Sequence, residues 1–242
     1  MENNLTSTVG EIAAKDFRTA SVFSKYGIDF CCGGDKTLEE VCKKQSIDVA
    51  KLQKELNDVV KNEGDNIDFN SWPLSLLTDH IEETYHTYIR EKIPVLLQFL
   101  GKIKEVHGEN HPELAKIFDL FSRSATDLGM HLQKEERILF PLIREIAEAE
   151  KIGCPPEEGH CGTIRNPISV MMEEHSTEGE RFKKISELSK GYTTPPDGCE
   201  TYRAAYKMLD DFERKLHKHI HLENNILFPK AIEMEKSLSD WQ

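Results

Sequence analysis

Apolar residues recur at intervals of three and four positions through the second part of the chain. The first such stripe includes Ile89, Ile93, Leu96, Leu100 and Ile103, and the same spacing extends back to His86. Three more run from Leu114 to Leu142, from Ile168 to Ile185 and from Leu209 to Leu227. This spacing places the side chains on one face of an α-helix, so the stripes predict long amphipathic helices, the first of them kinked at Pro94. Turn-like segments separate the stripes, which predicts an antiparallel four-helix bundle over residues 74–242.

Shorter helical segments precede the bundle, in residues 1–65. The stretches TVGE (8–11) and TLEE (37–40) are capping-box signatures, because a threonine is followed three residues later by a glutamate. Gly27 is expected to end one of these helices. The polar stretch NEGDNIDFNSWP follows, and its end, residues 66–73, predicts a linker. We therefore expect an all-α chain in which a small helical domain precedes the bundle.

Polar side chains interrupt the apolar stripes at six positions: His86, His131, Glu135, His175, His219 and Glu223. Burying a polar group without a partner costs roughly 2–7 kcal/mol. A single histidine on an apolar face is more often a hydrogen-bonded core residue than a ligand. Six together favour a metal centre, particularly because two His–Glu pairs have the i, i+4 spacing that shares one helix face.

The two His–Glu pairs belong to a repeat. HLQKEERILFP begins at position 131 and HIHLENNILFP begins at position 219, which is 88 residues later. His86 and His175 are separated by 89 residues. These spacings predict a duplicated helix hairpin in which each copy supplies two histidines and one glutamate. His86 and His131 also lie at similar distances from their turn, so they should reach the same height in the bundle.

Four imidazoles and two carboxylates suit two metal ions better than one. With both glutamates bridging, and an oxo or hydroxo bridge added, each octahedral ion keeps an open position. That pattern favours iron over structural zinc, whose sites close at four ligands. The competing di-iron pattern uses paired Glu-x-x-His motifs, and Glu83–His86 is its only example within a predicted helix.

The remaining histidines have no matching partner. His107 lies about 30 Å along the helix from His86, so it cannot bind the same centre. We interpret it as a turn residue, with an accessory metal or gating role as the alternative. The others are expected on the surface or in loops: His80, His160, His217 and His221. For His221 the alternative is a metal ligand in place of His219.

Vicinal cysteines occur in the stretch DFCCGG at 29–34. Cys31 and Cys32 cannot easily form a disulfide with each other, because the short ring strains its geometry. A helix capped near Thr37 would lower the pKa of a nearby thiol. We expect an exposed pair that binds metal or is redox-active, the alternative being two small buried residues. Cys42 is interpreted as a core residue. Cys154 and Cys161 are interpreted as loop thiols without a role, the alternative being metal binding or a stress-induced disulfide, and the sequence indicates no function for Cys199.

The charge balance narrows the range of functions. The net charge of −12 and the pI of about 5.4 disfavour a nucleic-acid partner. No apolar run reaches the length of about 18 residues that a membrane span needs. The amino-terminal residues do not resemble a signal peptide, and six cysteines are ordinary for a reduced compartment. We expect a cytoplasmic protein.

Several motifs together resemble the iron–sulfur cluster repair di-iron proteins. They are DFCCGG, YHTYIRE, HPEL, HLQKEERILFP, GTIRNPISVMMEEH and HLENNILFP. The resemblance implies a hemerythrin-like bundle, and the six stripe residues match the positions of its di-iron ligands. Cys31 and Cys32 match the family's cysteine pair, and His107 matches a histidine that the family tends to carry.

The same resemblance implies a function in nitrosative and oxidative stress. The protein would restore damaged iron–sulfur proteins by supplying iron, with the two thiols passing iron on or docking against the cluster. A homodimer is one option for its assembly. Two other functions stay open at this point: reduction of NO or O2 at the di-iron centre, and reversible binding of O2 or NO in a sensor.

Overall fold

The computed structural model describes residues 5–61, 67–153 and 163–239. Within these ranges the secondary structure is helical and contains no strand beyond one isolated bridge between Thr8 and Thr37. The all-α prediction is therefore confirmed. No helix in the described ranges is both long enough and apolar enough to cross a membrane. Two of the predicted loop thiols, Cys154 and Cys161, lie outside the described residues, as does His160.

Two compact units make up the chain. The first unit combines Met1–Leu77, Ile146–Glu157 and Ile220–Gln242. The second unit comprises Thr78–Glu145 and Glu158–His219. The first unit therefore contains the amino-terminal helices together with the last helix of the chain.

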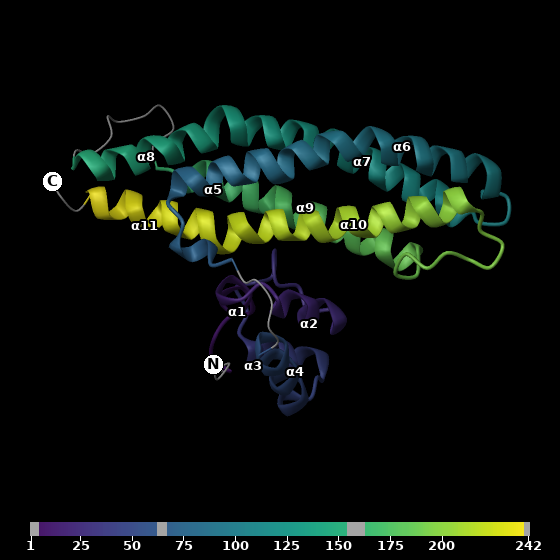
Figure 1. The fold of residues 1–242 in the computed structure, drawn as a ribbon, viewed down its shortest axis with the longest axis horizontal. Helices are drawn as coiled ribbons and strands as arrows, with labels where there is room; N and C mark the ends of the chain where they lie inside the picture. Colours follow the sequence, from purple (N-terminus) through teal and green to yellow (C-terminus); the bar gives the residue numbers. More distant parts are fainter. Residues whose placement is uncertain (1–4, 62–66, 154–162, 240–242) are drawn as a thin grey trace. The chain divides into compact units, whose positions relative to one another are not determined.

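Four long helices run side by side and make the bundle (Figure 1). They are α6 (Thr87–His107), α7 (Glu113–Lys134), α9 (Arg165–Leu188) and α10 (Glu200–Leu222). Within the second unit α7 packs against both α6 and α9. Fully buried aromatic rings fill the space between them, with Phe121 and Phe182 both against Phe212. The predicted four-helix bundle is confirmed, and α6 continues through Pro94.

Short π-helical segments interrupt three of these long helices. Along the chain, α5 (Leu74–His80) and η2 (Ile81–His86) precede α6. Likewise η3 (Glu135–Leu139) and α8 (Phe140–Ile152) follow α7, and η4 (Glu223–Leu227) and α11 (Phe228–Ser239) follow α10. Phe140 N–H donates to the carbonyl of Glu135, five residues back, and Phe228 N–H does the same to Glu223. The period of the apolar stripes did not predict these wider turns.

The amino-terminal helices are α1 (Val9–Lys15), α2 (Thr19–Lys25), α3 (Leu38–Gln45) and α4 (Val49–Lys61). Both predicted capping boxes are present, at Thr8 with Glu11 and at Thr37 with Glu40. Gly27 follows α2 with φ of +64°, a left-handed conformation that glycine adopts without steric cost. The helix ends foreseen from the sequence are therefore confirmed.

The described part of the expected linker is structured. It forms the 3-10 turn η1 (Phe69–Ser71), in which Phe69 is buried. Asn70 Nδ2 donates to the carbonyl of Ala14, 2.7 Å away. Lys230 Nζ of α11 donates to the carbonyl of Asn70 at 2.8 Å. These contacts connect the turn to both α1 and α11 within the first unit.

Candidate metal centre

The six polar residues of the apolar stripes are all buried in the bundle, each at most 3% exposed. The interrupted helices supply five of them: His86 ends η2, His131 lies in α7, Glu135 begins η3, His219 lies in α10 and Glu223 begins η4. His175, in α9, is the sixth. Both glutamates thus stand at the first position of a π segment, where the local backbone is wider than in an α-helix.

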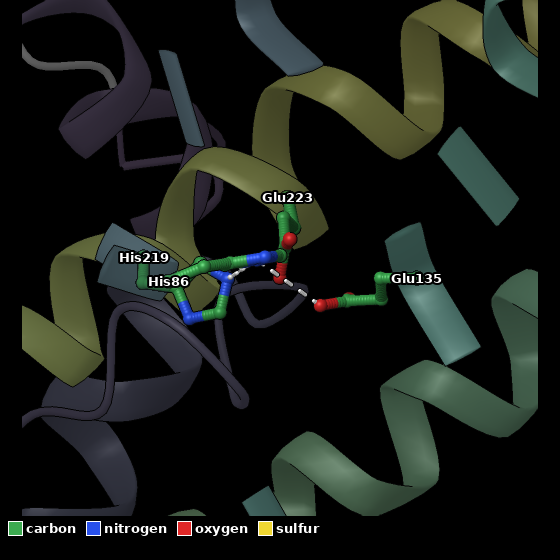
Figure 2. A group of neighbouring side chains, drawn as sticks. All are labelled: His86, Glu135, His219 and Glu223. Atoms are coloured by element: carbon green, nitrogen blue, oxygen red, sulfur yellow. Dashed lines mark hydrogen bonds and ion pairs between the residues drawn. The ribbon is translucent and has the colours of Figure 1, made fainter. Parts of the chain in front are cut away.

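The six side chains form two groups that share both carboxylates. One group is His86, His219, Glu135 and Glu223, and Figure 2 shows these four side chains pointing toward one another. The other is His131, His175, Glu135 and Glu223. Within each group the ligand atoms lie within 4.8 Å of one another. Two histidines per group with two shared glutamates is the arrangement expected for a pair of carboxylate-bridged metal ions.

The histidines within each group face each other through the same ring atom. His86 Nε2 lies 3.3 Å from His219 Nε2, and His175 Nε2 lies 3.0 Å from His131 Nε2. When such a nitrogen carries no proton, it presents a lone pair. Two facing lone pairs repel unless a cation between them accepts both.

A carboxylate outside the groups orients His86. Glu136 Oε1 lies 2.8 Å from His86 Nδ1, and Arg90 Nη2 lies 2.7 Å from the other oxygen of Glu136. An imidazole that donates its Nδ1 proton to a carboxylate keeps its lone pair at Nε2, as metal-binding histidines do. Although burial opposes it, hydrogen bonds from Arg90 and His86 lower the pKa of Glu136.

His131 is oriented in the same way. Glu174 Oε2 lies 2.8 Å from His131 Nδ1, and Lys134 Nζ pairs with the second oxygen of Glu174. The hydrogen bond with His131 lowers the pKa of Glu174 to about 2, with Lys134 contributing against the effect of burial. Each group therefore contains a histidine held by a carboxylate that is itself neutralised by a cation.

Glu135 shows the clearest need for a cation. Neither of its carboxylate oxygens, both buried, accepts a hydrogen bond from the described residues. His131 Nε2 and His86 Nε2 are the nearest nitrogens, at 3.2 and 3.4 Å. Burial alone would raise the pKa of Glu135, but the surrounding imidazoles hold it well below its usual range. A charged, buried carboxylate among imidazole nitrogens fits a di-iron site.

His107 belongs to neither group. Its Nε2 lies 3.2 Å from the sulfur of Cys199, at the junction of α6 with the loop before α10. No sequence pattern indicated a function for Cys199. This contact therefore gives His107 a specific partner that spacing along the chain could not reveal.

The expectation that His221 is a surface residue is wrong. Its side chain is 1% exposed and lies against the rings of Phe17 and Phe30, with centroid distances of 5.2 and 5.9 Å. Its Nδ1 lies 3.0 Å from Asn225 Nδ2. Aromatic side chains from the amino-terminal segment cover this part of α10, which the pattern within α10 alone did not show. His80 and His217 are half-buried.

The vicinal cysteines form a third group together with a residue that sequence reasoning missed. Asp29 Oδ1 accepts hydrogen bonds from the backbone N–H of Cys31 and Cys32, at 3.1 and 2.9 Å, and lies 3.3 Å from Cys31 Sγ. The three side chains are close enough to hold one metal ion. The sequence feature that could have indicated this group is the position of Asp29, two residues before Cys31, where an aspartate side chain can accept hydrogen bonds from the backbone and close a local turn.

The expected activation of these thiols by a helix N-terminus is wrong for Cys31. A hydrogen bond with the Cys32 thiol, burial and the charge of Asp29 together raise the pKa of Cys31 well above its usual value. Helix α3 begins only at Leu38, and the effect of a helix terminus fades within about one turn. Cys31 is also buried rather than exposed, whereas Cys32 is partly exposed. Their sulfurs are 3.8 Å apart, and neither cysteine forms a disulfide.

The cysteine loop contacts the segment that directly follows Glu223. Asn224 Nδ2 donates to the carbonyl of Cys31 and Asn225 Nδ2 to the carbonyl of Phe30, both at 3.2 Å. A Cβ at Gly10 would overlap the side chain of Asn225, so a larger residue there would displace the Asn225 amide. These contacts lie within the first unit and join the thiol loop to η4.

A helical bundle in which paired histidines share two buried carboxylates defines the class: a dinuclear metal-binding protein of the hemerythrin type. The model of the hemerythrin HHE cation-binding domain matches residues 77–231, and that of a domain of unknown function, DUF542, matches residues 5–60.

Similar proteins span nearly the full chain. The iron-sulfur cluster repair protein ScdA of Staphylococcus haemolyticus is 32% identical over 224 residues, covering 93% of this chain and 97% of its own. The repair protein YtfE of Musicola paradisiaca is 32% identical, with coverages of 94% and 97%. YtfE of Escherichia coli O81 is 33% identical, with coverages of 93% and 96%. The chain therefore belongs to the family of iron–sulfur cluster repair proteins.

Proposed function

We propose that the protein repairs iron–sulfur clusters damaged by nitrosative or oxidative stress, and that it does so by donating iron held in the bundle. The observation that carries the proposal is the pair of buried groups sharing Glu135 and Glu223. When bound there, iron is the cargo that a damaged cluster lacks. The four imidazoles and two carboxylates named above would be its ligands, and open positions on each ion would allow release.

Cys31 and Cys32 are proposed as the ligands that receive iron on its way out. Thiolates are the softer donors of the chain, and iron–sulfur clusters are themselves held by cysteine thiolates. Asp29 supports this role because its carboxylate completes the group of possible ligands. The hydrogen bonds from Asn224 and Asn225 further support it, since they join the thiol loop to the helix carrying Glu223.

The proposed partners are iron–sulfur proteins with damaged clusters, which is what the relatives' names describe. We propose the cytoplasm as the place of action, in keeping with a cysteine set suited to a reduced compartment. NO and O2 would reach the protein as the agents of the damage.

A transfer experiment tests the proposal directly. Full-length protein loaded with 57Fe is mixed with a dehydratase whose iron–sulfur cluster has been oxidatively damaged. We expect the dehydratase to regain activity and to carry 57Fe in its cluster by Mössbauer spectroscopy. The Cys31→Ser, Cys32→Ser double variant should load iron but transfer it more slowly, whereas Cys199→Ser, a thiol outside the loop, should transfer normally.

Two results would contradict iron donation. Recovery of the dehydratase with iron-free protein as fast as with loaded protein would show that the iron is not the cargo. Production of nitrous oxide beyond one turnover, with NO and a reductant supplied, would indicate an NO reductase instead.

A further inference from the structure

A second cluster of titratable side chains lies where α6 ends and α10 begins. It contains His107 and His111 from one side and Asp197 and Cys199 from the other, and all four belong to the second unit. Cys199 is a free, exposed thiol whose sulfur lies 3.2 Å from His107 Nε2. None of the four belongs to a metal-holding group in the described part of the chain.

The backbone of α10 also favours a thiolate at Cys199. The residue directly precedes this 23-residue helix, and its carbonyl accepts the N–H of Arg203 at 3.1 Å. Its sulfur therefore sits at the helix N-terminus, where free backbone N–H groups stabilise negative charge. The hydrogen bond with His107, assisted by the N–H groups of Tyr202 and Thr201, lowers the pKa of Cys199 to about 7.

The neighbouring charged groups are paired among themselves. His111 lies 3.1 Å from both Asp197 and Glu113, and the hydrogen bond with Asp197 raises its pKa. Arg203, next to Cys199 on α10, pairs with Glu200. His107 is thus the imidazole that acts on the thiol, while His111 neutralises the nearby carboxylates.

We propose that Cys199 and His107 form a solvent-facing site for thiol–disulfide exchange with small disulfides, distinct from the Cys31–Cys32 loop. A nucleophilic thiol that is exposed, lies within hydrogen-bond reach of a base and stands at a helix N-terminus is the arrangement that makes cysteines reactive. By contrast, Cys42 is free but buried in α3, where a disulfide cannot reach it.

The reaction is a balanced exchange. The Cys199 thiol gives its proton to His107 Nε2, and the thiolate attacks one sulfur of the disulfide. A new sulfur–sulfur bond forms to Cys199 as the old one breaks. Cys199 is oxidised to the disulfide level, and the departing sulfur is reduced to a thiolate, which takes up the proton. The small disulfide is the only oxidant required.

The test uses the full-length, iron-loaded protein with glutathione disulfide as the probe. Rates of mixed-disulfide formation are measured by peptide mass mapping between about pH 5 and 9. We expect Cys199 to react faster in the native protein than in the urea-unfolded chain at neutral pH, with a midpoint near 7. In His107→Gln the midpoint should move up by roughly one unit, toward the value of about 8.5 of a free thiol.

His111→Gln is the matched comparison, because it removes a neighbouring imidazole that pairs with Asp197 and Glu113 rather than with the sulfur, so its midpoint should move less than that of His107→Gln. The proposal is overturned if native Cys199 reacts no faster than the unfolded chain, or if His107→Gln leaves the midpoint in place. The comparison with the unfolded chain needs no variant, so it decides the matter even if a substitution impairs folding.

Discussion

Single residues around the metal groups set the orientation of the imidazoles. Glu136 and Glu174 do not belong to either group, yet each lies 2.8 Å from the Nδ1 of a buried histidine. Each is in turn paired with a cation from α6 or α7, Arg90 and Lys134. Such carboxylates fix the tautomer and raise the basicity of the nitrogen that binds metal.

Replacing Glu174 by Gln should weaken iron binding about 10- to 100-fold, because His131 loses the charged acceptor that keeps its Nε2 lone pair available. Only one group is affected, so we expect iron release to become biphasic. The measurement is competition for ferrous iron with a chromophoric chelator. Glu180→Gln, at an exposed position of the same helix, is the control and should release both ions as the wild type does. Monophasic release from Glu174→Gln would contradict the orienting role.

At the scale of elements, the π segments bring the two glutamates to the start of a widened turn. Pro141 and Pro229 each follow the residue that closes such a turn, Phe140 and Phe228. A proline cannot donate a backbone hydrogen bond, and its ring displaces the carbonyl four residues earlier. We infer that the proline of each ILFP motif favours the wider turn, a feature often found at functional sites.

Replacing Pro141 by Ala should allow α7 and α8 to continue as a regular α-helix and rotate Glu135 away from the shared position. Iron affinity should then fall by roughly tenfold or more, as when a ligand loses its orientation, while the helical circular dichroism stays the same. Pro94→Ala, within α6 and outside the π segments, is the control and should keep its iron. Unchanged affinity in Pro141→Ala would show that the π turn does not depend on the proline.

At the scale of the whole molecule, the net charge of −12 is carried by carboxylates that are mostly exposed, but a few are inside. Glu213 of α10 is half-buried and belongs to neither metal group. Burial raises its pKa to about 7, and the charge of Asp210 adds to the effect. At pH values between the pKa of Glu213 in the unfolded chain and its pKa in the native protein, the native protein keeps a proton on Glu213 that the unfolded chain releases. The stabilisation that comes from protonated Glu213 is fully present below the pKa of this residue in the unfolded chain, and it is lost as the pH rises through about 7.

Replacing Glu213 by Gln should therefore stabilise the protein only at higher pH. Above pH 7 the free energy of unfolding should exceed that of the wild type by roughly 1–3 kcal/mol, and the difference should shrink toward acid pH. Urea unfolding of the iron-loaded protein at about pH 5.5 and 8 measures it. A difference that does not change with pH would mean that Glu213 does not titrate in this range.

The homodimer stays a prediction, which light scattering on the native protein can check.

The sequence by itself determined the helices, their inward faces and the six polar residues on those faces. Each follows from periodicity within one segment, such as the i, i+4 spacing of His131 and Glu135. It also determined the caps at Thr8 and Thr37, because capping depends on side chains three residues apart.

Only the tertiary structure decided which histidines pair. His86 faces His219 of the other hairpin, and no local pattern fixes the packing of one helix against another. It likewise buried His221 under Phe17 and placed His107 against Cys199, 92 residues away. The physical reason is that these contacts depend on how separate helices are arranged in space, whereas hydrophobic periodicity reports only which side of each helix avoids water.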